Sequence, residues 1–553
     1  MAIYGIDLGT TYASVALAHR GVARMIPLES GGVTLASTVL LDGTDPALPS
    51  VTVGRRAALA WRDRCAALGC APPRVVLVRG SKNHLAVAHA VAGGPPWSLG
   101  PMALRSTDVG ALVLRALREW VERTPGLPPI DGVVVTHPQR LRNRERRAVA
   151  QAVSLAGLPC VAMLPEPDAA AWAYGMGQRF GARGARFMVF DFGGGTLDVT
   201  VLRRDGGAGA PTLEALASYG VQLGGLGVDE LLRERLLERY AEAARAPGLG
   251  LDALDEASRE ALLAVAEGVK IQLNQHATLD ANPMARVASR TLALRTEGGV
   301  ALPTATVRVT LGELARWTEE LTERAVACAE EALARANLGW RDLDEVLLVG
   351  GSSWLYPVQA RLRALRGAAA VRLFDDADDP LNPACAVAAG AALYAERCFT
   401  DGGMVGAEYH GVIPDALGVR AREADPARPG ERREALAVLV PALTRVPFEG
   451  RRVFRKRGGA RVLPLDVLEG ATLAEATALG RFEVALDEGM ADGAPVEVIL
   501  RVGRDGVLSV ELRDPQTQRS RAVTLTDAEG LYADDEMDVR RAFLAGVALD
   551  VGG

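Results

Sequence analysis

Aromatic residues and cysteines are scarce in this chain of 553 residues. Phe, Trp and Tyr together make up 5% of it, and the six cysteines are scattered without any C-x-x-C pair. Scattered cysteines of this kind favour reduced structural thiols over a disulfide framework. They therefore predict a cytoplasmic protein.

Long apolar runs and an excess of basic charge are also missing. No uncharged apolar run is long enough to span a bilayer, and the N-terminus shows no basic segment followed by an apolar core. We therefore expect no signal peptide and no membrane partner. The formal net charge of -6 argues against nucleic acid as a partner. A hydrophobic content of 49% and a charged content of 24% are typical of globular proteins, and the length suggests two to four domains.

The most informative stretch runs from Phe187 to Leu202. Two apolar, β-branched runs flank Asp191 and the sequence Gly-Gly-Gly-Thr196, a pattern that predicts two strands joined by a tight turn. Glycines let backbone N–H groups approach an anion that any Cβ would block. Asp191 ends the first strand, so its carboxylate can reach a metal or a water beside that anion.

A second copy of this pattern opens the chain. Ile3 to Ala16 contains a strand, Asp7, the turn Gly9-Thr-Thr11 and another strand. Two such hairpins predict a duplicated unit with a phosphate held between its halves. A strand follows the glycines in both copies, so neither is a Walker loop or a Rossmann turn.

Helical spacing predicts helices over 57–70, 108–123, 143–155, 254–275 and 311–338. A strand is expected over 33–41. Leu223 to Asp229 opens a further helix, with Asp229 in its first turn, which would place backbone N–H groups near any phosphate. On the helix over 254–275, four residues share one face: Glu267, Lys270, Ile271 and Asn274.

The composition changes at Cys398. Thr400 to Gly406 is Gly-rich and typical of a linker. Short strands punctuated by turn residues follow, which predicts an all-β sandwich, and 534–548 is expected to form one short helix. The expected strands cover 435–440, 461–468, 481–486, 496–502, 506–512 and 521–526.

The first ~395 residues resemble an actin-like ATPase domain, through Asp7-Leu-Gly-Thr-Thr11, Asp191-Phe-Gly-Gly-Gly-Thr196 and Leu348-Val-Gly-Gly-Ser-Ser353. Further motifs resemble the heat shock protein 70 (DnaK-type) chaperones specifically. These are Pro165 to Gly175, Leu223-Gly-Gly225, Ala266 to Leu273, Asn382 to Ala392 and, in the β region, Ile413 to Gly418, Val467 to Gly470, Leu479 to Phe482 and Asp505 to Val510.

The resemblance implies an α/β actin-like ATPase domain, duplicated in two lobes, followed by an all-β sandwich substrate-binding-like domain. It places the ATPase domain at 1–398, the linker at 399–408, the sandwich at 409–530 and a short helical tail at 531–553. The helical lid of the family is missing from this pattern, and a lidless cleft should exchange peptides quickly. The implied activity is ATP hydrolysis to ADP and phosphate, with ATP/ADP and Mg²⁺ as cofactors, regulating the binding of unfolded or client polypeptides.

The same resemblance implies roles for individual residues. Asp7 and Asp191 would hold Mg²⁺ through water, and Glu166 would accept or relay a proton. Lys82 would face the γ-phosphate, with Arg79 as the alternative. Pro138 and Arg146 would relay the nucleotide state. Phe454 and Leu463 correspond to the substrate cleft, although ordinary sandwich core explains both better. The catalytic set is Asp7, Glu166, Asp191, Thr196 and Lys82. The nucleotide-binding set is Gly9, Thr10, Thr11, Gly193, Gly194, Gly195, Gly224, Gly225, Glu267, Lys270, Asn274, Gly350, Gly351, Ser352 and Trp354.

Several positions depart from the family pattern. Trp354 replaces the arginine over the adenine, and Pro165 and Asp168 change the segment where J-domain partners dock. A J-domain partner is therefore doubtful, whereas a nucleotide exchange factor is compatible with the pattern. The leucine-rich acidic linker is replaced by Asp401 to Glu408, and a charged loop over 420–434 stands where apolar segments usually arch over a peptide.

These departures leave a second hypothesis open. The chain would then be a nucleotide-gated interaction module that binds ATP and one dedicated protein partner with little or no hydrolysis. The retained Asp7, Glu166, Asp191 and Thr196 favour hydrolysis. A sugar kinase or a filament-forming actin relative would leave the β sandwich unexplained.

Overall fold

The computed structural model describes the chain in the following ranges: 1–68, 71–84, 97–139, 141, 143–174, 184–205, 213–372, 382–399, 412–413, 415–424, 428, 431–442, 444–445, 447–456, 462–470, 472–485, 491–503, 508–523 and 531–551. Most of the expected linker therefore lies outside the described residues. No helix within these ranges has the length and hydropathy needed to cross a bilayer.

The N-terminal hairpin forms as expected and belongs to a mixed sheet. Its strands pair in antiparallel register, with Asp7 opposite Ser14, and β10 adds to β1 in parallel. The sheet order is β11-β10-β1-β2-β3, and β4 pairs with β2 off this path. The strands are β1 (Ile3–Leu8), β2 (Tyr12–His19), β3 (Val22–Met25), β4 (Leu35–Ala36), β10 (Gly132–His137) and β11 (Cys160–Pro165).

The second hairpin also forms, in a sheet with the same plan. Asp191 lies directly opposite Asp198, and β17 adds to β12 in parallel. The sheet order is β14-β13-β12-β17-β18, so the strand order and strand directions repeat those of the first sheet. The strands are β12 (Ala185–Phe192), β13 (Leu197–Arg204), β14 (Leu213–Val221), β17 (Glu345–Val349) and β18 (Val371–Arg372).

Two alanine-rich helices, α4 (Glu166–Ala173) and α11 (Ala386–Phe399), cross one another and pack with residues of both sheets in one apolar cluster. A Cβ on Gly390 would lie 1.7 Å from the backbone oxygen of Ala169, and a Cβ on Gly5 would lie 2.2 Å from the backbone nitrogen of Ala392. Only glycine fits such backbone approaches. This crossing fixes the position of Glu166, the first residue of α4.

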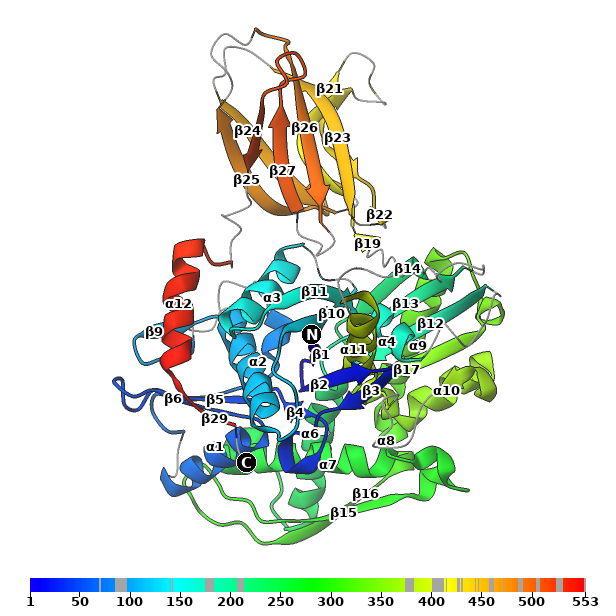
Figure 1. Ribbon diagram of the computed structural model, residues 1–553. Coiled ribbons are helices and arrows are strands. Elements are labelled where there is room, and N and C mark those ends of the chain that lie inside the picture. The colour runs from blue at the N-terminus through cyan, green and yellow to red at the C-terminus, as the bar shows by residue number, and fades with distance from the viewer. Residues whose placement is uncertain are drawn as a thin grey trace.

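The first sheet is flanked by α2 (Ser106–Arg123) and α3 (Asn143–Leu155), and a smaller sheet of order β29-β6-β5-β7 packs near them (Figure 1). The single strand expected over 33–41 is divided between β4 of the first sheet and β5 (Val39–Asp42) of the smaller sheet. Also in this part are β6 (Ser50–Val53), α1 (Arg55–Leu68), β7 (Val75–Val78), β8 (Trp97–Leu99) and β9 (Met102–Leu104).

The second sheet carries its own helices and a hairpin. The prediction of a single helix over 311–338 is wrong, because two helices meet at Thr318. The Thr318 hydroxyl donates to the Leu314 carbonyl oxygen at 2.9 Å. The helix expected over 254–275 is found as α7. The elements are α6 (Gly225–Ala243), α7 (Glu256–Asn274), β15 (Val287–Leu292), β16 (Ala305–Thr310), α8 (Leu311–Trp317), α9 (Glu319–Arg335) and α10 (Tyr356–Arg366).

The expected all-β sandwich is present beyond residue 412 (Figure 1). Two four-stranded sheets, ordered β21-β20-β24-β25 and β23-β26-β27-β28, enclose a core that includes Val419, Val467 and Val498. A short pair, β19 (Val412–Ile413) and β22 (Thr444–Arg445), lies beside them. The eight long strands are β20 (Leu417–Ala424), β21 (Arg432–Val440), β23 (Phe448–Arg455), β24 (Val462–Glu469), β25 (Thr477–Ala485), β26 (Pro495–Val502), β27 (Leu508–Arg513) and β28 (Ser520–Val523).

The charged loop expected over 420–434 is largely wrong. Residues 420–424 belong to β20 and residues 432–434 belong to β21, and the two strands pair with Arg420 opposite Leu436. The strand was hidden by its charges, since only its first three residues, 417–419, are buried, and exposed Arg420 and Arg422 follow. Opposite charges on neighbouring strands then pair, as Arg420 does with Glu434 and Asp466.

The tail forms the expected helix, α12 (Asp534–Gly546), but the helix ends before the predicted 548. A three-residue strand follows, β29 (Ala548–Asp550), which pairs in parallel with β6, about 500 positions earlier in the sequence. A strand of three residues is too short to show the alternation of apolar and polar residues by which strands are recognised in a sequence.

Candidate active site

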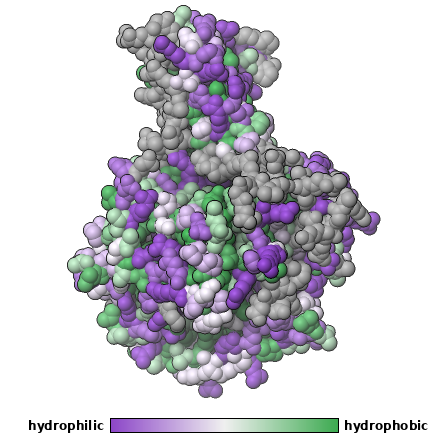
Figure 2. All heavy atoms as spheres, in the orientation of Figure 1, coloured by the Kyte–Doolittle hydropathy of each residue, from purple (hydrophilic) through white to green (hydrophobic). Residues whose placement is uncertain are grey.

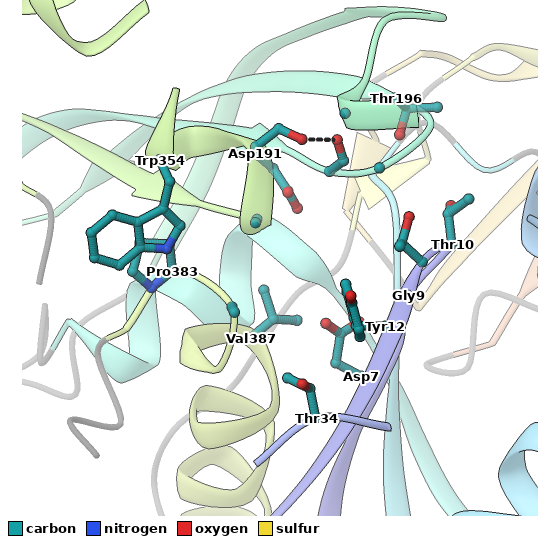
Figure 3. A pocket seen from close by; sticks show the side chains of 18 of the residues that line it. Asp7, Gly9, Thr10, Tyr12, Thr34, Asp191, Thr196, Trp354, Pro383 and Val387 are labelled. Atoms are coloured by element: carbon teal, nitrogen blue, oxygen red, sulfur yellow. Dashed lines mark hydrogen bonds between the residues drawn. The ribbon is translucent and has the colours of Figure 1, made fainter. Parts of the chain in front are cut away.

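A cavity of about 670 Å³ is lined by residues from both hairpin turns, α7, the segment after β17 and the start of α11. Figure 3 shows Thr10 and Thr196 toward one end of it, Trp354 at the other, and Asp7 and Asp191 between them. Of the predicted catalytic and nucleotide-binding residues, all line this cavity except Gly195 and Gly224.

The two hairpin turns come so close together that side chains are excluded from them. A Cβ on Gly194 would lie 1.8 Å from Oγ1 of Thr11, and a Cβ on Gly224 would lie 2.2 Å from the backbone oxygen of Gly194. The Leu226 amide donates to that same oxygen at 2.9 Å. Oγ1 of Thr11 is buried and has no hydrogen-bond partner among the described residues. This arrangement leaves a cradle of amides and hydroxyls suited to an anion.

Helix α6 begins at this cradle, but one detail of its prediction is wrong. The helix starts at Gly225, so Asp229 lies in its second turn rather than its first. The Asp229 carboxylate accepts a hydrogen bond from Nζ of Lys270 at 2.7 Å. Burial raises the pKa of Asp229 to about 6, although Lys270 opposes this shift.

Carboxylates gather on the floor of the cavity. Oδ1 of Asp7 accepts a hydrogen bond from Thr136 Oγ1 at 3.2 Å. Burial raises the pKa of Asp7, and Lys82 counteracts part of that effect. The pKa of Asp191 is raised well above its usual value by burial and by the charges of Glu166, Asp198 and Asp7. So many buried carboxylates ionise together only when cations balance them.

Lys82 is the cation inside this group. It follows β7 in a short 3₁₀ turn, its side chain is 9% exposed, and its Nζ lies 2.7 Å from Oε1 of Glu166. Burial alone would lower the pKa of Lys82, but Glu166, Asp7 and Asp191 outweigh burial and raise it. The ammonium group is therefore charged, and the structure places Lys82 rather than Arg79 in the cavity.

Arg79 has a different position. Its guanidinium donates to Oε1 of Glu260 on α7 and does not line the cavity. Apolar residues support this contact, because Ala57 and Trp61 of α1 share a buried cluster with Ala257 of α7. Arg79 thus joins the two halves of the structure beside the cavity.

Glu166 has an acidity suited to proton transfer. Burial raises its pKa to about 7, with Lys82 lowering it and Asp7 raising it further. A carboxylate with a pKa near 7 can accept a proton and release it again at neutral pH.

The end of the cavity opposite the turns has polar and aromatic walls. Glu267 accepts a hydrogen bond from the Tyr12 hydroxyl at 2.6 Å, and Asn274 accepts one from the Tyr356 amide at 2.9 Å. The Trp354 ring meets His276 edge to face, with ring centroids 5.8 Å apart. An indole exposed to the cavity offers a face on which a flat heterocycle can stack.

The remaining predicted residues divide between two places. Pro138 lines the cavity. Arg146 is buried and does not line it, and after burial itself the charge of Arg146 helps to lower the pKa of His137 to about 3. Phe454 and Leu463 are half-buried and pack against the sandwich core, away from the cavity.

Several lining residues were missed from the sequence. Asp198 is the clearest, since a hairpin with Asp191 at one turn end places residue 198 directly opposite it. Tyr12 follows the predicted Thr11, and its strand position points it toward α7. Others, such as Thr34 and Arg55, lie in segments without a recognisable motif.

The residues present fit a hydrated divalent cation. Carboxylate oxygens are the ligands that Mg²⁺ prefers, and Mg²⁺ usually keeps several of its waters. Within the described ranges, no three His, Cys, Asp or Glu side chains converge as a direct ligand set. Asp7, Asp191 and Asp198 line the cavity and would hold such a cation through its water shell.

Comparison with known proteins identifies the family. The Hsp70 protein family model matches residues 81–542. The heat shock 70 kDa protein BIP3 of Oryza sativa subsp. japonica is 31% identical, and the match covers 97% of this chain and 77% of that protein. Chaperone protein dnaK3 of Synechococcus elongatus is 29% identical over 96% of this chain and 67% of its own length. The chain belongs to the Hsp70 family of ATP-dependent chaperones, which combine an actin-like ATPase with a β-sandwich domain.

Proposed function

We propose that this chain binds ATP with Mg²⁺ in the cavity, hydrolyses it slowly, and uses the nucleotide state to regulate the binding of client polypeptides. One observation carries the catalytic part of the proposal. A buried, charged Lys82 contacts Glu166 beside Asp7 and Asp191, in the cavity where the two hairpin turns meet. Phosphoryl transfer requires mainly positioning and charge neutralisation, and this group of residues supplies both.

Each residue has a distinct task in this proposal. The amides of the Gly193–Thr196 turn and the hydroxyl of Thr11 hold the phosphates, and Lys82 neutralises the transferred phosphoryl group. Glu166 accepts the proton of the attacking water. Asp7, Asp191 and Asp198 hold and orient the hydrated cation, which when bound screens the charge of the phosphates. Trp354 stacks on the base in place of an arginine.

The same proposal assigns the two sheets to duplicated lobes. Their common strand order, and the similar placement of Asp7 and Asp191 at the first strand of each hairpin, support this assignment. The ATPase domain would span 1–398, and Pro138 with Arg146 would transmit the nucleotide state from the cleft. Partners of the family, such as a nucleotide exchange factor, would act from outside the cleft, in the cytoplasm.

A nucleotide-gated module with one dedicated partner remains the second candidate, because ion pairs cover much of the described sandwich surface, beside the exposed apolar residues Val438, Phe448, Val453 and Val462. Phe454 and Leu463 pack against its core. Its outer face is mainly hydrophilic over β23, β26 and β27 (Figure 2), and ion pairs such as Arg452–Glu423 and Arg501–Glu449 cover part of it. Such a face favours a specific polar partner over unfolded chains.

Single-turnover ATP hydrolysis by the full chain, with and without an unfolded model peptide, separates the two candidates. A chaperone cycle predicts that the peptide accelerates hydrolysis severalfold. Hydrolysis that ignores a broad panel of peptides would contradict client regulation and favour the dedicated partner. Asp191→Asn serves as the control, because the loss of its charge should abolish turnover in either case.

A further inference from the structure

The chain returns to its N-terminal half after the sandwich. Helix α12 lies against α2 and α3, and β29 extends the sheet of β6 and β5 (Figure 1). The segment 531–551, called here the return segment, therefore contacts elements that precede it in the chain by roughly 380 positions or more. Three kinds of contact hold it there.

The first is a buried ionic cluster around Asp108. This carboxylate belongs to α2 and is 0% exposed. Nη1 of Arg540 lies 2.7 Å from its Oδ2, and the hydroxyl of Tyr532 donates to the same oxygen. The Arg540 guanidinium stacks over the Tyr532 ring at 4.0 Å, and Arg105 stacks on the same ring at 4.4 Å. A buried carboxylate left without its cation is strongly destabilising, so the cluster favours the docked state.

The second kind of contact satisfies the backbone of the return segment. Nη1 of Arg115 donates to the carbonyl oxygens of Leu544 and Val547, at the C-terminal end of α12. The side chain of Gln151 donates to the Tyr532 carbonyl at 2.7 Å and accepts from the Tyr532 amide at 3.1 Å. Side chains of α2 and α3 thus replace water at both ends of the helix.

The third is apolar packing. Leu531, Met537, Leu544, Val547 and Val551 are each less than 10% exposed and belong to the same buried cluster as the core of the first sheet. Removal of the return segment would expose this groove and leave β6 as an open sheet edge.

We propose that the return segment is an intramolecular tie that keeps the sandwich beside the N-terminal half in every nucleotide state. Only eight residue steps separate Val523, the end of the sandwich, from Leu531. At ~3.5 Å per residue, the sandwich end stays within about 28 Å of the docked segment. The link before the sandwich, from Phe399 to Val412, has thirteen steps and would by itself allow about 45 Å.

With the return segment docked, the sandwich is connected to the N-terminal half at both of its ends. A domain held at both ends samples a smaller volume, so its effective concentration at the N-terminal half stays high. Nucleotide binding can then shift the sandwich only within the shorter tether. This inference does not depend on ATP hydrolysis, and it would stand if the cavity bound nucleotide without turnover.

A protease site introduced within 524–530 of the full chain tests the tie after folding. Following cleavage, the fragment that contains residues 531–553 should co-elute with the rest of the protein on size exclusion. Departure of this fragment from the otherwise wild-type protein would overturn the proposal. Because the cut is made in the folded protein, the result does not depend on how a truncated chain folds.

Two matched substitutions test the ionic cluster in the cleaved protein. Arg540→Ala should speed fragment release at least tenfold, since it leaves Asp108 without its cation. Asp538→Ala, whose ion pair with Arg541 lies within the return segment and is exposed, should change the rate less than threefold. Equal release rates for the two variants would overturn the role of the cluster.

Distances between spin labels on the N-terminal half and the sandwich complete the test. Uncleaved protein should give similar narrow distributions without nucleotide, with ADP and with ATP. Cleavage of the Arg540→Ala variant, followed by release of its fragment, should broaden them. Distributions that stay unchanged on release, or that shift beyond the tether on ATP binding, would contradict the tie.

Discussion

Arg79 donates to the carboxylate of Glu260 and so joins the segment after β7 to helix α7. This ion pair connects the two halves that contribute walls to the cavity, and it lies near the contact of α1 with α7. A nucleotide enclosed by both halves leaves only when they separate. Nucleotide release should therefore depend on this pair, although neither residue lines the cavity.

We expect Arg79→Ala and Glu260→Gln each to accelerate the release of ADP severalfold, with little change in the rate of hydrolysis. The reason is that either change removes an attraction between the two halves. Stopped-flow release of a fluorescent ADP analogue measures the effect. Arg64→Ala is the matched control, because its partner Asp42 lies in the same half. Equal release rates for the Arg79 and Arg64 variants would contradict this account.

Lys82→Met should lower single-turnover hydrolysis by on the order of 100-fold while the protein still binds ATP, because the substitution removes the only positive charge described among Glu166, Asp7 and Asp191. Quenched-flow hydrolysis and equilibrium nucleotide binding measure the two effects separately. Arg79→Ala again provides the comparison. A Lys82 variant with wild-type turnover would exclude Lys82 as the phosphate-facing cation.

The raised pKa of Glu166 predicts a dependence of stability on pH. Its usual value of 4.5 rises to about 7 in the folded protein without nucleotide. The folded state therefore binds more protons than the unfolded state, and the stabilisation is present below pH 4.5 and is lost as the pH rises through 7. Thermal unfolding from pH 5 to pH 8 should show a fall that is shallower in Glu166→Gln. Identical pH profiles for the two proteins would contradict the assignment.

Binding of ATP with Mg²⁺ should release protons near neutral pH. A bound cation favours the ionised forms of Glu166, Asp7 and Asp191, whose pKa values are raised without it. Calorimetric titration in buffers of different ionisation enthalpy counts the protons. We expect net release at pH 7, and the absence of any release would show that the carboxylates are already ionised before binding.

Gly390→Ala should strongly destabilise the protein. The new Cβ would lie 1.7 Å from the Ala169 backbone oxygen, and relief requires that α11 and α4 move apart, at a cost of about 1–3 kcal/mol or more. Gly268→Ala on α7 is the control, since its nearest neighbour atom would be 3.8 Å away, and it should stabilise the helix by about 0.5–1 kcal/mol. Thermal denaturation compares them, and similar effects of the two changes would be inconsistent with the tight crossing.

The sequence predicts the parts of this protein that depend on local pattern. Both hairpins form as expected, because a strand, an acidic residue and a glycine turn specify each of them within about 15 residues. Family motifs correctly indicate the α/β part and the sandwich. Two local predictions were wrong: the helix expected over 311–338 is interrupted at Thr318, and β20 was not recognised as a strand because of its charges. Both features depend on packing and cross-strand pairing, which the local sequence pattern does not contain.

The unpredicted features are those that join distant segments. Spacing favoured Lys82 but left Arg79 as an alternative, and the fold places Lys82 beside Glu166 in the cavity and Arg79 on Glu260. Asp198 required the hairpin register to be known. The Arg540–Asp108 pair joins positions 432 residues apart, and neither residue lies in a recognisable motif.

The most direct test of the central claim compares ATP hydrolysis and ATP binding in wild-type protein and in Asp191→Asn. Single-turnover hydrolysis with Mg²⁺ should fall at least 100-fold in the variant, while ATP still binds through the glycine turns and the Trp354 end of the cavity. This result would place the reaction among Asp7, Glu166 and Asp191. Turnover equal to that of the wild type would show that hydrolysis does not occur in this cavity as proposed.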